Sequence, residues 1–336
     1  MKKETLIQKA ETLTKKKGAL TKRFVKATSD AYNPMEKIFQ MVIGEFPSIT
    51  NSWPGSFGEP NIENVLVAQE KKYEEYFNNL RLKEHAGMKV YEIGPGWGPF
   101  SHYCRERGVD VVSVSPAEKK YEYLKNMGYD VHHGIWQEFT PDSGPFDAIV
   151  AMGSPEHCVS PADYDAGEQD NIYRTFFDYC YDLLKPGGRI GGQMMTFNGR
   201  EIDSSKLQVK EEGKDAESQL YYHLGLLSYR YPDAWLPRDF DHFFSCAKEG
   251  QYEVVNVVDG REQYIWTMKG WESGFWKIAP MKKWFMVAGL IIKSFFDTDF
   301  GYWRKAFFKT SNRKCFEKGW MGHEFWFVEK KRILKV

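Results

Sequence analysis

The sequence predicts an α/β fold with a seven-stranded, mostly parallel sheet, and three observations lead to that prediction. From residue 88 onward, short apolar segments alternate with helical segments, the pattern of parallel strands joined by crossover helices. A glycine-rich turn at residues 94–98 joins the first apolar segment to the first of these helices. Two late apolar segments, 252–258 and 323–328, flank an aromatic helical insertion and can complete the sheet.

The predicted strands and helices follow from changes in the spacing of apolar residues along the chain. The predicted strands cover residues 88–93, 109–114, 129–133, 146–152, 189–196, 252–258 and 323–328. The predicted core helices cover residues 99–107, 117–127 and 170–184, and the segment 185–188 is expected to be a turn. Upstream, a helix through residues 34–41, a Pro/Gly/Ser loop and a helix over 62–82 form a helical cap. We therefore divide the chain into a helical N-terminal extension, 1–87, and a core, 88–336, with insertions at about 197–250 and 260–320.

Composition excludes several classes of protein. The 336 residues carry 46 basic and 46 acidic side chains, so the basic excess typical of a nucleic-acid-binding domain is absent. The five cysteines are scattered without a CxxC pair or a His-Cys cluster, which argues against a disulfide framework and a metal site and favours a cytoplasmic location. The longest apolar run, 284–292, is much shorter than the ~20 residues that a transmembrane helix needs.

Two features leave alternatives open. Aromatic residues are numerous, with 24 Phe, 19 Tyr and 11 Trp, and they either form a large core or line a pocket for an apolar or cationic ligand. Residues 1–30 are rich in lysine and helical in character. They form either a solvated helix or a peripheral contact with a membrane surface or a partner. The sequence does not indicate an oligomeric state.

The glycine-rich turn carries the first chemical signal. Its glycines, Gly94, Gly96 and Gly98, allow a tight turn and a close approach of backbone to ligand, with a helix N-terminus pointing at that ligand. The spacing differs from the GxGxxG of dinucleotide sites, and an acidic residue, Glu92, stands two positions before the first glycine. This arrangement is typical of sites for a nucleoside joined to methionine. The alternative is a turn with no ligand.

The following strands add polar residues where such a ligand needs them. Candidate contacts to a ribose come after the second strand, and a polar-aromatic turn that suits an adenine ring comes after the third. The fourth strand ends at Gly153, in the crevice where parallel sheets bind ligands. The candidates are Ser113, Ser115, Glu118, Trp136 and Gln137. Their order predicts a class I, Rossmann-like methyltransferase core that binds S-adenosylmethionine and releases S-adenosylhomocysteine.

Over residues 30–336 the sequence resembles the cyclopropane-fatty-acid synthase and mycolic-acid methyltransferase family. The resemblance rests on Tyr32, Thr50-Asn51-Ser52-Trp53, the glycine turn, Trp136-Gln137, Glu156-His157, Tyr173, Gln263-Tyr264 with Thr267 and Trp271, and Phe316 with Gly319. It implies that the segment containing Tyr32, Asn51 and Ser52 is a lid over the cofactor. It also implies ribose contacts from Glu118, adenine contacts from Trp136 and Gln137, and methionine contacts from Ser52 and the backbone of Gly94 and Gly96.

Two departures from the family bear on the reaction. By resemblance, members that form cyclopropanes hold a bicarbonate base with a lid Cys, the Glu of Glu-His, a His on the fifth strand and the late Tyr. This sequence keeps Glu156 and Tyr264 but has Trp53 in place of the Cys and Gln193 in place of the His. We therefore expect methyl transfer without ring closure.

Glu156 and Tyr264 are accordingly the candidate catalytic residues. Glu156 either removes a proton from the acceptor or stabilises a developing cation, and the alternative is that it only orders its loop. The acceptor site is expected from residues 197–310, with the helix around 284–292 as a cover. Its predicted walls are Trp235, Leu236, Pro237, Phe240, Phe243, Phe244, Trp266, Trp271, Phe275 and Trp276. The predicted acceptor is a small or lipid-like molecule methylated on carbon, sulfur or nitrogen. The alternatives are a cyclopropane or branched-lipid synthase and a non-catalytic cofactor-binding scaffold.

Overall fold

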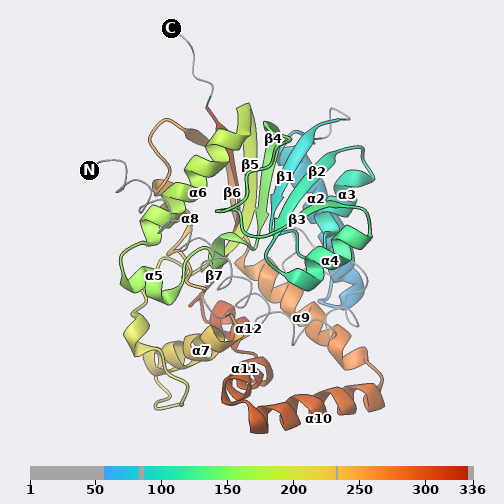
Figure 1. The fold of residues 1–336 in the computed structure, drawn as a ribbon. Coiled ribbons are helices and arrows are strands. Elements are labelled where there is room, and N and C mark those ends of the chain that lie inside the picture. Colours follow the sequence, from blue (N-terminus) through green and yellow to red (C-terminus); the bar gives the residue numbers. More distant parts are fainter. Residues whose placement is uncertain (1–56, 83–86, 232–233, 332–336) are drawn as a thin grey trace, which may run out of the picture.

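A seven-stranded mixed sheet forms the centre of the molecule (Figure 1). The computed structural model describes residues 57–82, 87–231 and 234–331. The strand order is β3-β2-β1-β4-β5-β7-β6, and β7 is antiparallel to both of its neighbours while the other pairs are parallel. The strands are β1 Lys89–Ile93, β2 Asp110–Ser115, β3 Asp130–His133, β4 Phe146–Met152, β5 Leu184–Thr196, β6 Tyr252–Asp259 and β7 Gly322–Lys330. The predicted sheet is confirmed.

Helices cover both faces of the sheet and the carboxyl ends of its parallel strands. They are α2 Ile62–Asn79, α3 Pro99–Arg105, α4 Glu118–Asn126, α5 Pro161–Asp165, α6 Gln169–Leu183, α7 Ala216–Arg230, α8 Phe240–Ser245, α9 Arg261–Lys277, α10 Pro280–Phe296, α11 Thr298–Phe308 and α12 Ser311–Glu317. Two short 3₁₀ helices, Pro155–His157 and Ser204–Lys206, follow β4 and β5. The predicted N-terminal lid, with Tyr32, Asn51, Ser52 and Trp53, lies outside the described residues.

The two faces of the sheet bury separate apolar clusters, as the alternation of side chains along a strand requires. In β7, Phe325 and Phe327 pack with α2 and α3, whereas Trp326 packs with α6 and α8 on the opposite face. Tyr76 of α2, for example, meets Phe327 edge to face at 5.0 Å. The aromatic richness of the sequence is therefore largely explained by a core on each side of one sheet.

The turn after β1 has the conformation that its glycines predict. Gly94, Gly96 and Gly98 have φ angles of 76°, 60° and 76°, in the left-handed region that favours glycine. Gly98 is the residue before α3, and Pro99 occupies the first helical position, where its missing N–H costs nothing. Since β1 is flanked by β2 and β4, this turn lies at the point where the strand order reverses, the usual ligand crevice of such sheets.

The predicted turn at residues 185–188 is part of β5 instead. The strand begins at Leu184, and the pairing with β4 jumps from Phe146↔Leu184 to Ala148↔Arg189. Residues 185–188 stand opposite the single residue Asp147 and form a bulge in which Gly187 has a φ angle of 79°. The Lys-Pro-Gly-Gly sequence thus bends a continuous strand rather than preceding one.

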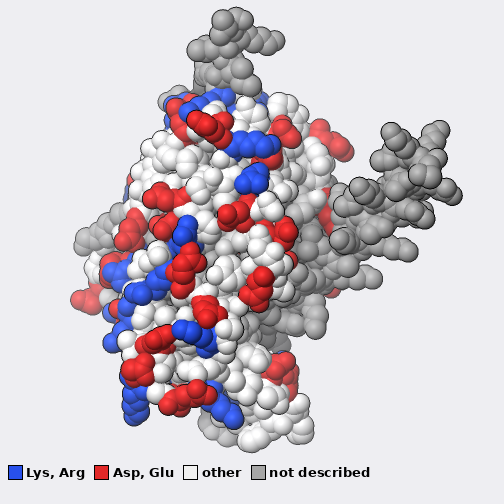
Figure 2. Space-filling view, turned by 90° about the vertical axis from the view of Figure 1, so that its left-hand side faces the viewer, with Lys and Arg blue, Asp and Glu red and all other residues white. Residues whose placement is uncertain are grey.

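The insertions form a helical layer beyond the carboxyl ends of the parallel strands. In Figure 1, helices α7 and α9–α12 lie below the sheet, and α10 forms the lower edge of this layer. Across the described ranges, no helix is both long enough and apolar enough to cross a membrane. On the face that Figure 2 shows, acidic and basic side chains are interspersed, in keeping with the balanced charge of the sequence.

Candidate active site

A cleft opens at the carboxyl ends of β1, β2 and β4, around the glycine turn. Seven of the predicted cofactor contacts line it: Glu92, Gly94, Gly96, Ser115, Trp136, Gln137 and Gly153. Both predicted catalytic residues, Glu156 and Tyr264, line the same cleft. Tyr73, Lys120, His157 and Tyr231 also line it. Of these four, only His157 is named in the sequence analysis, as part of the Glu156-His157 motif.

The glycine turn leaves room for a ligand. A β-carbon added to Gly96 would have no protein atom within 4 Å, so it would project into open space. A β-carbon at Gly98 would instead lie 2.4 Å from Leu124, which shows that this glycine permits close packing of α3 against α4. Gly96 is therefore the position where backbone is exposed to the cleft, and Gly98 is absent from the cleft lining.

Glu92 and Ser101 form a buried hydrogen bond at the floor of the cleft. The Ser101 hydroxyl donates to the Glu92 carboxyl over 2.5 Å, and both side chains are buried. Burial raises the pKa of Glu92 to about 7, while the Ser101 hydrogen bond and the nearby Lys72 favour the carboxylate. A carboxylate at this position can accept hydrogen bonds from a cationic amino group or from hydroxyls of a ligand.

Trp136 and Gln137 form one wall of the cleft. The Trp136 ring is held by Phe176, which it meets edge to face at 5.5 Å, and by Tyr179 at 5.3 Å. The side-chain oxygen of Gln137 is buried and has no hydrogen-bond partner in the described part of the chain. An aromatic wall beside an unsatisfied acceptor suits a planar heterocycle with an exocyclic amino group.

Three predicted contacts are not brought to the cleft. Gly98 packs on Leu124, Ser113 is buried within β2 opposite Glu92 of β1, and Glu118 is exposed in the first turn of α4. Ser115 and Lys120, on either side of Glu118, line the cleft instead. The helical period explains the difference, because residues two apart on α4 face different directions.

Glu156 lies in the 3₁₀ helix that follows β4 and is only 1% exposed. Its Oε2 atom is buried without a hydrogen-bond partner among the described residues. Burial raises the pKa of this carboxyl to about 8, although backbone hydrogen bonds, including one from Met195, act in the opposite direction. A raised pKa and an unpaired oxygen at a cleft are typical of an acid-base group rather than of a residue that only orders a loop.

Tyr264 comes from α9 and lines the cleft. Its ring is buried between His323 of β7, at 4.9 Å, and Phe316 of α12, at 4.8 Å. Burial raises the pKa of the Tyr264 hydroxyl above its usual range. The phenol is therefore neutral at physiological pH, and the residue lines the cleft.

Gln193 and His323 are buried polar residues near this site whose side chains make no hydrogen bond within the described residues. Both polar atoms of the Gln193 side chain and both ring nitrogens of His323 lack a partner. They lie two strand positions apart on paired strands, since Gln193 pairs with Phe325 and Met195 pairs with His323. Burial lowers the pKa of His323 to about 3, so its ring is neutral. No role was predicted for His323, and nothing local in the sequence distinguishes it.

A second, apolar cavity joins the cleft beside Glu156. Four residues line both: Glu156, His157, Met195 and Tyr231. The remaining lining is Pro161, Phe197, Ile202, Leu207, Leu224, Leu227, Ser228, Ala234, Trp235, Leu236 and Met321. Nearly all of these side chains are apolar, and they come mainly from α7 and from the loops that precede and follow it.

Only part of the predicted acceptor walls lines this cavity. Trp235 and Leu236 line it as predicted, but Phe240 and Phe243 are buried against the sheet, where Phe243 lies 5.5 Å from Trp326. Phe244, Trp266, Trp271, Phe275 and Trp276 do not line it, and Trp276 is 70% exposed. The predicted cover, the helix around 284–292, is α10, which has no buried residue and lines neither cavity.

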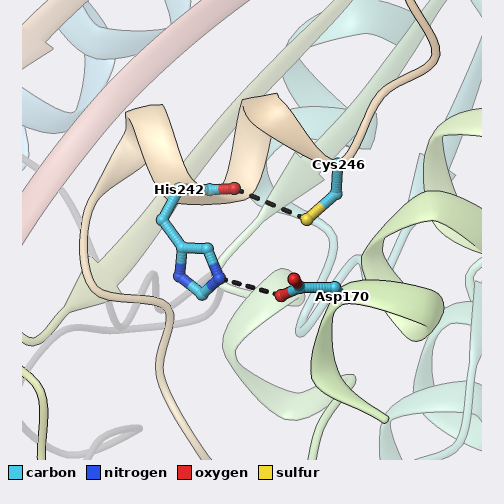
Figure 3. A group of neighbouring side chains, drawn as sticks. All are labelled: Asp170, His242 and Cys246. Atoms are coloured by element: carbon cyan, nitrogen blue, oxygen red, sulfur yellow. Dashed lines mark hydrogen bonds and ion pairs between the residues drawn. The ribbon is translucent and has the colours of Figure 1, made fainter. Parts of the chain in front are cut away.

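Asp170, His242 and Cys246 form a cluster away from the cleft, shown in Figure 3. His242 and Cys246 come from α8 and the residue after it, and Asp170 comes from α6. The Arg238 backbone N–H donates to Nδ1 of His242, so the Nε2 atom carries the proton and donates to Asp170 over 3.0 Å. Because Nε2 then has no free lone pair, the cluster is satisfied by hydrogen bonds and is not arranged as a metal site.

Comparison with known proteins agrees with this fold. Residues 20–310 match the family described as mycolic acid cyclopropane synthetase. Cyclopropane mycolic acid synthase 2 of Mycobacterium leprae (strain TN) is 26% identical over 264 residues, which are 74% of this chain and 79% of the relative. The crystal structure of mycolic acid cyclopropane synthase CmaA1, complexed with SAH and CTAB, has a TM-score of 0.69 at 16% identity and covers 91% of this chain and 98% of that chain.

The cyclopropane-fatty-acyl-phospholipid synthase of Escherichia coli (strain K12) matches a shorter part of the chain. It is 33% identical over 129 residues, which are 38% of this chain and 30% of the relative. The fold and the cleft at its switch point define a class I S-adenosylmethionine-dependent methyltransferase. More particularly, the chain belongs to the mycolic acid cyclopropane synthetase family.

Proposed function

We propose that this enzyme transfers a methyl group from S-adenosylmethionine to an amphipathic acceptor whose apolar chain occupies the second cavity, without ring closure. The observation that carries the proposal is the boundary between the two cavities, where Glu156, His157, Met195 and Tyr231 line both. An acceptor in the apolar cavity would therefore meet the cofactor beside one buried carboxyl group.

The lining of the second cavity supports a chain-like acceptor. Its walls are built mainly from Leu, Ile, Phe, Trp and Met side chains, with Ser228 as one of the few polar groups away from the boundary. A polar acceptor would leave its hydrogen-bonding groups unpaired there, whereas an acyl or prenyl chain would not. The names of two relatives, a mycolic acid synthase and a fatty-acyl-phospholipid synthase, point to the same class of acceptor.

The cleft suits S-adenosylmethionine in charge and shape. We assign the methionine end to Glu92 and to the backbone at Gly94 and Gly96, where open space meets the glycine turn. We assign the adenine to Trp136 and Gln137, the aromatic wall with an unsatisfied acceptor. Tyr32, Asn51 and Ser52 stay predictions for the lid, and Gly98, Ser113 and Glu118 are proposed to support the site rather than to contact the ligand.

The chemistry assigned to Glu156 follows from its environment. When bound, the cofactor supplies an electrophilic methyl group on a positively charged sulfur. A cation beside Glu156 favours its carboxylate, which then faces the positive charge that passes to the acceptor. If the acceptor is an alkene carbon, the C–C bond forms as the S–C bond breaks. Glu156 then accepts the proton that the methylated acceptor loses, and a new double bond results.

The absence of ring closure is inferred from Gln193. By resemblance, ring-forming relatives hold a bicarbonate base with a histidine at this position. The Gln193 amide is neutral and fully buried, so it offers no positive charge to an anion. Glu156 is therefore proposed to be the proton acceptor in this enzyme. Tyr264 would contribute the oxygen of its neutral hydroxyl to the stabilisation of the acceptor cation.

The proposal is tested with vesicles of monounsaturated phosphatidylglycerol and S-adenosylmethionine labelled with ¹³C in its methyl group. We expect one labelled carbon per modified acyl chain and NMR signals of a methylidene group, without the upfield signals of a ring methylene. Ring-methylene signals would contradict the absence of ring closure. No label in any lipid, with S-adenosylhomocysteine binding intact, would contradict the acceptor class.

A further inference from the structure

The outer surface of α10 is the largest exposed apolar feature of the described residues. Seven large apolar side chains of this helix are exposed: Met281, Trp284, Phe285, Ile291, Ile292, Phe295 and Phe296. Phe295 and Phe296 are 80% and 88% exposed. Scattered apolar residues are normal on a protein surface, but a contiguous set of this size marks an interaction site.

These side chains form one stripe. They recur at intervals of three and four residues along the 17 residues of α10, which places them on a single face. At a rise of about 1.5 Å per residue the stripe runs the length of a helix of about 25 Å. We call these seven residues the α10 stripe.

The rest of the helix is already used in packing. Met286 and Leu290 pack on the cluster that contains Phe300 and Trp303 of α11, on the side of α10 opposite the stripe. The core therefore needs one face of α10, and the stripe adds nothing to it. A helix that is apolar on a second face has a second apolar environment to meet.

The charges beside the stripe identify that environment. Residues 280–296 contain Lys282, Lys283 and Lys293 and no acidic residue. Lys283 is held against α9, where its ammonium donates to the Trp276 carbonyl oxygen over 3.0 Å, whereas Lys282 is exposed beside the stripe. Aromatic side chains at both ends of an apolar face, flanked by lysines, are the composition of helices that lie in a lipid headgroup layer.

The position of α10 agrees with this assignment. Figure 1 shows α10 at the outer edge of the helical layer, lying across the end of the molecule, so that the stripe can meet a flat surface. Helix α11 packs between α10 and α7, and Leu224, Leu227 and Tyr231 at the α7 side line the apolar cavity. With 17 residues, α10 is too short to span a bilayer.

We propose that the α10 stripe docks this enzyme on the surface of an anionic lipid bilayer, with the stripe at the level of the headgroups and Lys282 against lipid phosphates. Docking in this way brings the wall of the apolar cavity close to the membrane from which a lipid acceptor would enter. The proposal stands on α10 and does not depend on the identity of the acceptor.

Flotation with vesicles tests it. The full chain is mixed with vesicles of phosphatidylglycerol and phosphatidylcholine, or of phosphatidylcholine alone, and compared with the variant Trp284→Ser/Phe295→Ser/Phe296→Ser. These side chains are exposed, so the variant should fold, and S-adenosylhomocysteine binding verifies that it does. The matched control is Leu66→Ser/Val67→Ser, which removes exposed apolar residues of α2.

We expect the unchanged chain and the α2 control to float with the anionic vesicles and the stripe variant to lose that affinity by more than about tenfold. Lys282→Glu should weaken binding to the anionic vesicles selectively, and added salt should do the same. Equal flotation of the stripe variant and the unchanged chain would overturn the proposal. So would a change from dimer to monomer in sedimentation of the stripe variant without a change in flotation, because the stripe would then bind a second copy.

Discussion

The imidazole ring of His323 lies face to face with the phenol ring of Tyr264, with centroids 4.9 Å apart and planes inclined by 8°. The histidine comes from the last strand and the tyrosine from α9, and both side chains are only 1% exposed. Burial keeps the pKa of His323 near 3, so the stack is between two neutral rings. Its role is to fix the direction in which Tyr264 enters the cleft.

This stack predicts a difference between two substitutions. His323→Phe retains a ring and removes two buried nitrogens without partners, so the free energy of unfolding should be unchanged or higher. His323→Ala opens a cavity against Tyr264 and should lower the free energy of unfolding by about 2–4 kcal/mol. Urea unfolding of the two variants measures both changes. A phenylalanine variant less stable than the alanine variant would show that the nitrogens have partners in solution.

Gly96→Ala should weaken binding of S-adenosylhomocysteine by more than about tenfold, because the added β-carbon enters the space assigned to the ligand. Gly128→Ala is the matched control. Gly128 also has a positive φ angle, 75° against 60°, and open space at its β-carbon, but it lies outside the cleft. Both variants should lose about 1 kcal/mol of stability, and calorimetric titration should detect a loss of binding only for Gly96→Ala. Equal binding losses would contradict the assignment of the cleft.

The affinity for S-adenosylmethionine should rise with pH relative to that for S-adenosylhomocysteine. Burial raises the pKa of Glu156 to about 8, so the free enzyme holds this group largely protonated below that pH. The sulfonium favours the carboxylate, and its binding must therefore release a proton below pH 8 and none well above it. The affinity for S-adenosylmethionine therefore rises by at most about tenfold per pH unit, and the rise ends near pH 8.

Calorimetry of both ligands between pH 6 and 9 measures this difference. The two ligands differ only in the methyl group and the positive charge on sulfur, so the contributions of Glu92 and Lys72 that are common to both cancel in the comparison. Glu156→Gln should remove the pH dependence of the difference. If the pH dependence of this difference in affinity is unchanged in the glutamine variant, another group is responsible for it.

Glu156→Gln should also lower kcat by about 10²–10⁴-fold while retaining S-adenosylhomocysteine binding, since a glutamine cannot accept the proton. Glu324→Gln is a control for the loss of a partly buried carboxyl group. Burial raises the pKa of Glu324 to about 7, yet this residue does not line the cleft. The Glu324 variant should keep its turnover. Full turnover in the Glu156 variant would mean that this carboxyl only orders its loop.

Local signals in the sequence explain which parts of this structure were predictable. The turn at Gly94 and Gly96 is fixed by residues within a few positions of each other, because a strand, alternating glycines and a proline-initiated helix each leave a local pattern. The seven strands followed from the same kind of signal. The Lys-Pro-Gly-Gly segment was misjudged because turn residues also form bulges, and only the pairing with β4 distinguishes the two.

The acceptor site was less predictable because burial of an aromatic residue depends on distant neighbours. No local feature of the sequence distinguishes Phe243 from Trp276 as a candidate wall of the acceptor site. In the structure, Phe243 packs against Trp326, whereas Trp276 is exposed next to α10. His323 had no local signal at all, since its relation to Tyr264 depends on α9 folding back over β7. Residues 260–320 therefore had a predictable helical character and an unpredictable arrangement.

The central claim is that the cofactor sulfur and the acceptor meet at the boundary lined by Glu156, and a crystal structure with S-adenosylhomocysteine tests it most directly. The account predicts that the sulfur lies within about 4–6 Å of the Glu156 carboxyl group, the range over which a charge acts strongly on such a group, and faces the apolar cavity. A sulfur directed away from Glu156, with the apolar cavity closed off from it by protein, would contradict the account.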